Sequence, residues 1–334
     1  MQSNDCEMKK ILIIQTAFIG DVILSTSLVE KLKQSDPEIQ VDFLLRKGNE
    51  GVLSNNPHIQ HIYIWDKKKK YASLFQNLKE IRKNKYDWVI NCQRFFTSGI
   101  FTLFCGAKKR AGFKKNPLSL FFHKRVAHDI NSGIHEVERN QKLISHLTDN
   151  NYSLPKMYPG DMEFRKIESL AQLPYVCIAP TSVWFTKQFA KEKWVELIVG
   201  LPLNLNIYLI GSLKDRSYCN TIKESSGITR VCNLCGDLSL IETSALMKNA
   251  RVNYVNDSAP LHIASSVHAR VVAIFCSTIP QFGFGPLSMN SKVVESQENL
   301  PCRPCGLHGK KKCPEGHFHC ALTIDVQEII KLDF

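Results

Sequence analysis

The chain of 334 residues is too long for a single ordinary hydrophobic core, and 44% hydrophobic and 22% charged residues are typical of a globular protein. No apolar run reaches the ~18 residues of a membrane-spanning helix, and the N-terminus lacks an apolar leader segment, so we expect a cytoplasmic protein. Of the net charge of +12, most lies in residues 1–150, which hold 24 Lys and Arg against 15 Asp and Glu; this predicts either an anionic partner or a merely solvated basic surface.

Strand and helix patterns alternate along the chain. The first half predicts strands at 11–14, 41–45, 61–64 and 88–91, with helices at 24–34 and 73–84. After a segment rich in Asn, Pro and Gly near 150–170 the alternation restarts, with strands at 175–179, 206–210, 252–255 and 271–275 and helices at 193–199, 216–225, 240–248 and 260–266. This order predicts an α/β protein with two Rossmann-like parallel-sheet domains in series.

Ligands of open parallel sheets bind beyond the carboxyl ends of the strands, so the loops after the strands and a central cleft between the two domains are the expected site. There is no GxxxxGK[ST] and no GxGxxG, which argues against a P-loop and ordinary dinucleotide binding.

The first such loop brings Gly20 and Asp21 to the start of a helix. A Gly-Asp pair at this place is typical of a helix cap, but a carboxylate there can also serve as a general base. The helix N-terminus favours the ionised form of Asp21, which predicts a modest base.

Three loops of the second half carry groups that suit an anionic ligand. The loop "NDSAPLHIA" supplies Asp257, Ser258, Ala259 and His262 at a helix start, where free N–H groups attract phosphate unless Asp257 or Ser258 caps the helix. The loop "APTSVWFTKQF" supplies Thr181, Ser182, Thr186 and Lys187, and "GSLKD" supplies Asp215.

The stretches "ILIIQTAFIGDVILSTSLVEKLK", "PTSVWFTKQFAKEKW", "NDSAPLHIA" and "FGFGPL" resemble glycosyltransferase family 9, the ADP-heptose:lipopolysaccharide heptosyltransferases. The resemblance runs from about residue 9 to 330 and implies the GT-B architecture: an acceptor-binding domain at 1–160, a donor-binding domain at 161–322, and a C-terminal helix at 323–334 that packs back on the N-terminal domain.

The resemblance also implies residue roles. Asp21 matches the general base, Lys187 the lysine at the donor's diphosphate, and the 257–262 loop the donor loop, with Ala259 where the family usually has glycine. It implies an inverting displacement assembled by closure of the two domains, ADP-heptose as donor, and no cofactor for the chemistry. The acceptor would be an anionic lipid A core, which places the protein peripherally on the cytoplasmic side of the inner membrane.

The segment "KKRAGFKKNPLSLFFHKR", residues 108–125, has basic residues around Leu118, Leu120, Phe121 and Phe122 and suits an anionic membrane surface. Alternatively, these apolar residues are buried and the lysines are simply solvated. Acceptor contacts are predicted for Gly20, Arg94, Arg110, Lys114, Lys115 and His135, and Glu136 is a further candidate. No recognition motif indicates nucleic acid as a partner.

Four cysteines, Cys302, Cys305, Cys313 and Cys320, stand at C-x2-C-x7-C-x6-C spacing. This predicts a structural zinc site; a disulfide formed on oxidation, or reduced thiols, are the alternatives. A similar segment occurs in the heptosyltransferase II subset of the family. The other functions left open are the same donor with another glycan or a protein as acceptor, and a non-catalytic nucleotide-binding or zinc-module protein.

Overall fold

The computed structural model describes residues 9–332. Two predictions lie partly outside the described residues. They are the lack of a leader at residues 1–8 and the end of the C-terminal helix at residues 333–334. The chain divides into two compact units, Met1–Ile130 with Glu136–Lys156, and Asn131–His135 with Met157–Phe334. The division at 156 lies near the predicted 160, but residues 131–135 group with the second unit.

The first unit is built on a six-stranded sheet in the order β3-β2-β1-β4-β5-β6, and every neighbouring pair is parallel, as predicted. Its strands are β1 (Lys10–Gln15), β2 (Gln40–Arg46), β3 (Ile59–Trp65), β4 (Trp88–Asn91), β5 (Lys109–Phe113) and β6 (Lys124–Val126). The sequence did not predict β5 and β6, which occupy much of the basic segment 108–125.

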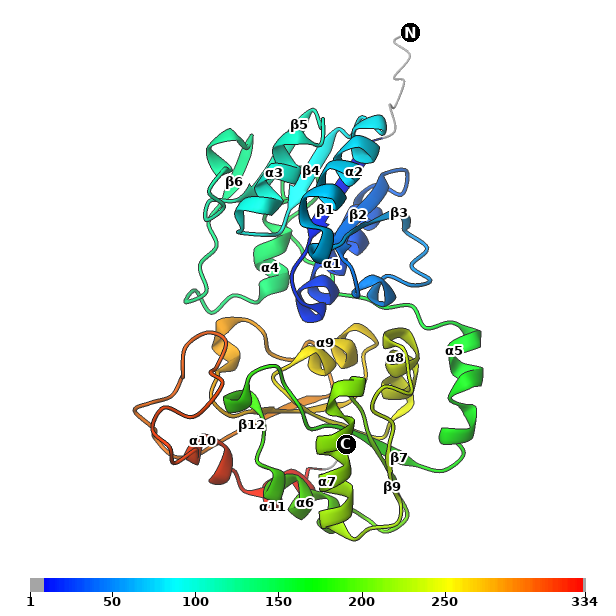
Figure 1. Cartoon of the computed structure of the whole chain (residues 1–334), viewed down its shortest axis with the longest axis vertical. Coiled ribbons are helices and arrows are strands. Elements are labelled where there is room, and N and C mark those ends of the chain that lie inside the picture. Colours follow the sequence, from blue (N-terminus) through cyan, green and yellow to red (C-terminus); the bar gives the residue numbers. More distant parts are fainter. Residues whose placement is uncertain (1–8, 333–334) are drawn as a thin grey trace. The chain divides into compact units, whose positions relative to one another are not determined.

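Helices cover both faces of this sheet (Figure 1, blue to green). They are α1 (Ile19–Ser35), α2 (Lys70–Lys83), α3 (Phe96–Phe104) and α4 (Glu136–Gln141). Alternate residues of a strand point to opposite faces. Leu12 and Ile14 therefore pack with Leu74, Leu78 and Phe101 from α2 and α3, while α1 and α4 contact each other on the opposite face.

The second unit repeats the design with the order β12-β11-β10-β7-β8-β9, again all parallel. Its strands are β7 (Tyr175–Ala179), β8 (Asn206–Leu209), β9 (Val231–Asn233), β10 (Asn253–Asn256), β11 (Val271–Phe275) and β12 (Ser291–Glu295). Its helices are α5 (Asp161–Lys166), α6 (Lys191–Gly200), α7 (Arg216–Ser226), α8 (Leu240–Asn249), α9 (Ala259–Ser266), α10 (His319–Leu322) and α11 (Val326–Ile330).

The C-terminal helix α11 belongs to the core of the second unit. Val326 and Ile329 are fully buried there with residues of α6 and β7, and Ile330 lies against Gly200 at the end of α6. The expectation that this helix packs on the N-terminal domain is therefore wrong for residues 326–330. Its apolar side chains complete the layer over the second sheet instead.

Each sheet reverses its strand order beside its first strand. In the first unit β1 lies between β2 and β4, and in the second β7 lies between β8 and β10. Loops diverge where the order reverses and leave a crevice at the carboxyl ends of the strands. The loops after β1 and β4, and those after β7 and β10, are therefore placed to hold ligands.

Candidate active site

Asp21 lies in the first turn of α1, just beyond the carboxyl end of β1. The helix begins five residues earlier than the predicted 24, so the carboxylate sits on the helix and accepts a hydrogen bond from the Phe18 N–H at 3.3 Å. Gly20, in the same turn, brings no side chain. The local geometry is thus that of a cap, with the carboxylate at the expected edge of the sheet.

Burial, with the nearby Glu136 carboxylate adding to it, raises the pKa of Asp21 to about 6, and the Phe18 N–H and Arg94 only partly oppose this. The expected direction, a pKa lowered by the helix N-terminus, is wrong because desolvation outweighs the backbone donors. A carboxyl of this pKa is ionised in about nine of ten molecules at pH 7 and is a stronger base than an exposed aspartate.

Glu136 acts on Asp21 because it stays ionised in a buried position on α4. Its carboxylate lies 3.1 Å from His128 Nε2 and accepts a hydrogen bond from Arg139 Nε at 2.7 Å. Burial alone would raise the pKa of Glu136, but the hydrogen bonds and charges of His128 and Arg139 hold it below the ordinary value. Sequence reasoning ranked Glu136 only as a weak acceptor candidate and found neither partner, since the contacts join separate segments.

The acceptor candidates separate in the structure. Arg94 lies in the short loop between β4 and α3 and is close enough to lower the pKa of Asp21. Lys114 and Lys115 are exposed just after the carboxyl end of β5, at the same edge of the sheet.

Arg110 does not join them. It pairs with Val89 near the start of β4, and its guanidinium donates to the carbonyls of Thr102 and Leu103 at the end of α3. Arg110 therefore stabilises a helix C-terminus near the opposite end of the sheet, away from the edge that carries Asp21.

His135, which was predicted to contact the acceptor from the first domain, groups with the second unit instead. It belongs to the second unit, where its Nε2 lies 3.1 Å from the carbonyl oxygen of Gly285, and its charge influences His262. The structure thus brings His135 beside the donor loop.

Lys187 ends a short 3-10 helix, Phe185–Lys187, in the loop after β7. Its Nζ lies 2.7 Å from Asp257 Oδ2, and Asp257 also accepts a hydrogen bond from Thr278 Oγ1 at 2.6 Å. The side chains of Lys187 and Asp257 are 15% and 7% exposed. Asp257 therefore orients the lysine instead of capping α9, and the pair comes from the two strands at which the sheet order reverses.

The N-terminus of α9 has no side-chain cap. Ser258 is the N-cap residue without a capping hydrogen bond, Ala259 follows it, and Pro260 has no N–H to satisfy. Both capping alternatives raised for Asp257 and Ser258 are thus absent from this helix. An uncapped helix start beside a lysine favours an anionic group.

His262 lies in the first turn of α9 and is buried. Burial, followed by the charges of His135 and Lys187, lowers its pKa to about 3, so the imidazole is neutral at pH 7. Its buried Nδ1 has no hydrogen-bond partner among residues 9–332. Such an atom is costly unless a ligand or water meets it.

The remaining donor candidates have mixed surroundings. Thr181 and Ser182 are half-buried at the carboxyl end of β7. Asp215 closes its own turn, accepting from the Ser212 N–H at 2.8 Å and from Ser212 Oγ at 2.6 Å. Thr186 is buried and accepts from the Lys310 N–H at 2.8 Å and from Ser277 Oγ at 3.0 Å, so it joins the loop to the cysteine segment.

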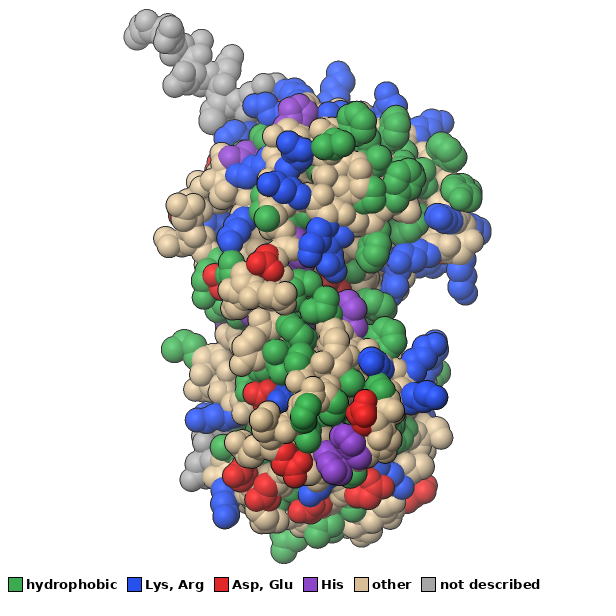
Figure 2. Space-filling model, turned by 90° about the vertical axis from the view of Figure 1, so that its left-hand side faces the viewer, with side chains coloured by type: hydrophobic (Ala, Val, Ile, Leu, Met, Phe, Trp, Pro, Cys, Tyr) green, Lys and Arg blue, Asp and Glu red, His purple; other side chains and the backbone are tan. Residues whose placement is uncertain are grey.

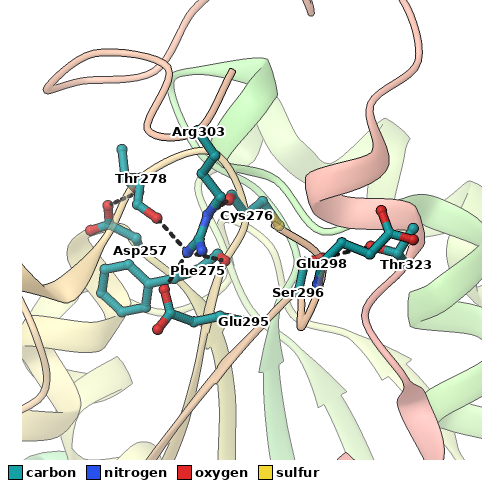
Figure 3. A network of polar contacts seen from close by, with 9 residues as sticks. All are labelled: Asp257, Phe275, Cys276, Thr278, Glu295, Ser296, Glu298, Arg303 and Thr323. Carbon is teal, nitrogen blue, oxygen red and sulfur yellow. Dashed lines mark hydrogen bonds and ion pairs between the residues drawn. The ribbon is translucent and has the colours of Figure 1, made fainter. Parts of the chain in front are cut away.

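The cysteine segment, residues 302–320, folds onto these loops. Arg303 donates to the carbonyls of Phe275, Cys276 and Thr278 and pairs with Glu295; Figure 3 shows it beside Thr278, whose hydroxyl reaches Asp257. A side chain on Gly309 would come 2.9 Å from Lys187 Cγ. No sequence signal pointed to Arg303, Thr278 or Gly309.

The four cysteines of this segment are free, with Cys320 buried and the others half-buried. Burial raises the pKa of Cys320 to about 12, and Cys313, Cys305 and Cys302 add to the shift, so the thiols are near one another. Within residues 9–332, however, no three or more His, Cys, Asp or Glu side chains are arranged to hold a metal ion. The zinc prediction gains no support from this geometry and stays a prediction.

Three comparisons with known proteins match this chain over most of its length. The family model described as glycosyltransferase family 9 (heptosyltransferase) matches residues 74–318. Lipopolysaccharide heptosyltransferase 3 of Escherichia coli is 29% identical over 277 residues, 78% of this chain and 82% of that protein.

Two solved structures share the fold. The E. coli ADP-heptose lipopolysaccharide heptosyltransferase II superposes with a TM-score of 0.79 at 20% identity, covering 96% of each chain. E. coli heptosyltransferase WaaC with ADP-2-deoxy-2-fluoro heptose gives 0.66 at 18% identity, covering 89% of this chain and 96% of that one. The predicted α/β fold of the GT-B class is thereby confirmed.

Proposed function

Because this chain belongs to glycosyltransferase family 9, the heptosyltransferases, we propose that it transfers heptose from ADP-heptose to the inner core of lipopolysaccharide. Asp21 removes the proton of the acceptor hydroxyl, and Lys187 with the start of α9 receives the charge of the leaving ADP. The acceptor oxygen bonds to the anomeric carbon as the bond to the diphosphate breaks, which inverts that centre in one displacement.

The environment of Lys187 is the observation that carries this proposal. A buried cation held by Asp257, an uncapped helix start and the unpartnered Nδ1 of His262 lie at one reversal of strand order. A cation and a helix N-terminus stabilise the negative charge that develops on a leaving diphosphate. Here these groups are already oriented before the reaction begins. The solved structure of E. coli WaaC contains ADP-2-deoxy-2-fluoro heptose, which supports ADP-heptose as the donor.

The raised pKa of Asp21 supports its role as the base. A carboxylate near pKa 6 keeps enough basicity to take a proton while remaining ionised at neutral pH. Arg94, Lys114 and Lys115 lie at the same edge of the first sheet and suit an anionic acceptor. The mechanism requires the base, which acts on the acceptor hydroxyl, and the donor loop, which acts on the leaving diphosphate, to work in the same displacement.

A lipid-linked acceptor places the protein peripherally on the cytoplasmic surface of the inner membrane. In residues 9–332 no helix is both long and apolar enough to span a bilayer. Contact with the membrane would therefore be made by a surface of the folded chain.

The test is transfer from a panel of ADP-, UDP- and GDP-sugars to a deacylated core acceptor, read by product mass and anomeric configuration. We expect an inverted heptose product from ADP-heptose only. Lys187→Ala should lower kcat by about 10²–10³, whereas Lys223→Ala, an exposed lysine of α7, should not change it. Transfer from another nucleotide sugar, or retention of configuration, would refute the proposal.

A further inference from the structure

The first unit carries an apolar groove between α2 and α3. The groove has a volume of about 770 Å³. Its floor is formed by Leu74 and Leu78, which are buried and belong to the core, together with Ile100. Its rim is formed by Tyr71, Phe75, Phe96 and Phe104.

The rim side chains remain largely in solvent. Tyr71 and Phe75 are both 68% exposed, and Phe96 and Phe104 are both 56% exposed. Large aromatic residues gathered in this way on a folded chain mark a contact surface, because single exposed apolar residues are ordinary but contiguous ones are rare. Figure 2 shows hydrophobic side chains grouped on one side of the first unit, with Lys and Arg at their margin.

The patch continues past α3. Asn116 Nδ2 donates to the Phe95 carbonyl at 3.0 Å, and Gly99 of α3 leaves room for Leu118, which a Cβ there would meet at 3.1 Å. These contacts hold the following turn, Ser119–Phe121, against the start of α3. Leu120 and Phe121 of that turn are 77% and 64% exposed. We call the whole surface the aromatic–basic face: Tyr71, Phe75, Phe95, Phe96, Phe104, Leu120 and Phe121.

The charges around this face are almost all positive. Residues 67–85 hold eight Lys and Arg and a single acid, Glu80. Lys70, Lys79 and Arg82 line the groove itself, and Lys114 and Lys115 precede the exposed turn. Aromatic side chains surrounded by cations match a layer of anionic headgroups over hydrocarbon, whereas a protein partner would need an extended acidic rim of its own.

We propose that the aromatic–basic face docks this protein on an anionic phospholipid bilayer, with its aromatic rim in the acyl boundary and a lipid chain in the α2–α3 groove. The inference rests on the peripheral membrane location proposed above and assigns the surface responsible. Part of this surface, Leu120 and Phe121, was predicted from residues 108–125. The larger part, on α2 and α3, was not, because the two helices are separated by β4 in the sequence and meet only in the fold.

The test uses the full chain and vesicles of phosphatidylglycerol with phosphatidylcholine, compared with phosphatidylcholine alone, in a sedimentation assay. The wild type should bind the anionic vesicles, and added salt should weaken binding. Phe75→Ser with Phe104→Ser, and separately Lys79→Glu with Arg82→Glu, should each weaken binding by at least about tenfold.

Matched controls change the same chemistry elsewhere: Tyr152→Ser, a half-exposed aromatic, and Lys223→Glu with Lys292→Glu, two exposed lysines of the second unit. They should bind as the wild type does. Equal binding by the face variants and the wild type would overturn the proposal. So would a dimer in vesicle-free solution that the Phe75→Ser and Phe104→Ser pair dissociates, because the face would then cover a second copy.

Two further measurements separate the possible failures. Phe75→Trp should gain quenching by brominated lipid relative to Tyr152→Trp, a readout that does not depend on a destabilising change; equal quenching would contradict the proposal. Transfer of heptose to a deacylated, soluble acceptor should be unchanged in the face variants. Vesicle binding without any heptose transfer by the wild type would refute the proposed function and leave the docking surface standing.

Discussion

The reactivity of Asp21 and Lys187 depends on the side chains around them. Asp21 is made basic by burial and by the ionised Glu136, while Lys187 is held in place by Asp257 and Thr278. One carboxylate thus stays poised to accept a proton, and the other keeps a cation oriented. Substitutions at these residues should therefore change the pH dependence of transfer and the stability of the folded protein.

Glu136→Gln should shift the acidic limb of the kcat/KM profile to lower pH. The wild-type limb is expected near pH 6, because transfer requires ionised Asp21. Removing the neighbouring negative charge lowers the pKa of Asp21, so the base stays ionised in more acidic solution. Glu138→Gln on the same helix is the control and should leave the limb in place; an unmoved limb in Glu136→Gln would contradict the coupling.

Asp21→Asn should stabilise the folded protein at pH 7 while removing activity. Folding raises the pKa of this carboxyl from 3.8 to about 6, so its ionisation destabilises the folded state as pH rises through 6. Below about pH 4 the carboxyl is protonated in both states and the substitution should have little effect. Urea unfolding should give a gain on the order of 1 kcal/mol at pH 7; a loss of stability at pH 7 would count against the raised pKa.

At the scale of elements, the cysteine segment lies against the loop of Lys187, where we propose that the donor binds. Arg303 fastens it to the end of β11, and its Lys310 backbone pairs with Thr186 in the loop of Lys187. Gly309 passes closest to the lysine and has a φ of +72°. The segment therefore determines how much room Lys187 has.

Gly309→Ala should weaken ADP binding measured by calorimetry, because the new Cβ would meet Lys187 and Thr186 at 2.9 Å. Gly306→Ala is a matched control. Its φ of +78° imposes the same left-handed strain of about 1 kcal/mol, but apart from its chain neighbours no atom of residues 9–332 lies within 4 Å of the added carbon. Both variants should lose some stability, and only Gly309→Ala should lose affinity for ADP; equal affinities would show that the segment does not shape the site.

The metal content of the same segment can be tested directly. The C-x2-C-x7-C-x6-C spacing predicts about one zinc per chain in protein purified without chelator, and removing it should free four reactive thiols. Elemental analysis with thiol titration measures both. A metal-free protein in which Cys302, Cys305 and Cys313 already react would end the zinc prediction and agree with the described geometry, in which Cys320 is buried.

The sequence predicted the central strands well and the peripheral elements poorly, for a physical reason. Buried parallel strands such as β1 and β7 are continuous apolar runs that pattern alone detects. By contrast, β6 consists of Lys124, Arg125 and Val126, and it is a strand only because it pairs with β5. Similarly α1 starts at Ile19 after Phe18, whose side chain makes no capping hydrogen bond, so no Ser, Thr, Asp or Asn at the N-cap position marked its beginning.

The residues of the candidate site also differ in whether the sequence could predict them. Asp21, Lys187 and His262 follow strands in the sequence and could be found there. The groups that tune them, His128, Arg139, Thr278 and Arg303, act through contacts between distant segments, which no local pattern contains.

At the scale of the whole molecule, most of the net positive charge and most of the exposed aromatic residues belong to the first unit, and the buried Lys187–Asp257 pair belongs to the second. This division matches a transferase whose lipid-linked acceptor and soluble nucleotide donor arrive separately. Helix α11 packs into the core of the second unit. The proposed function requires that Asp21 deprotonates the acceptor while the second unit binds the donor.

The most direct test of that claim is turnover by Asp21→Asn with saturating ADP-heptose and a deacylated core acceptor, alongside calorimetry with ADP. We predict that kcat falls by about 10²–10⁴ while the Kd for ADP is unchanged, because the substitution removes the base and leaves Lys187, Asp257 and α9 intact. An Asp21→Asn enzyme that keeps turnover within a few fold of the wild type, or one that loses ADP binding, would contradict the account.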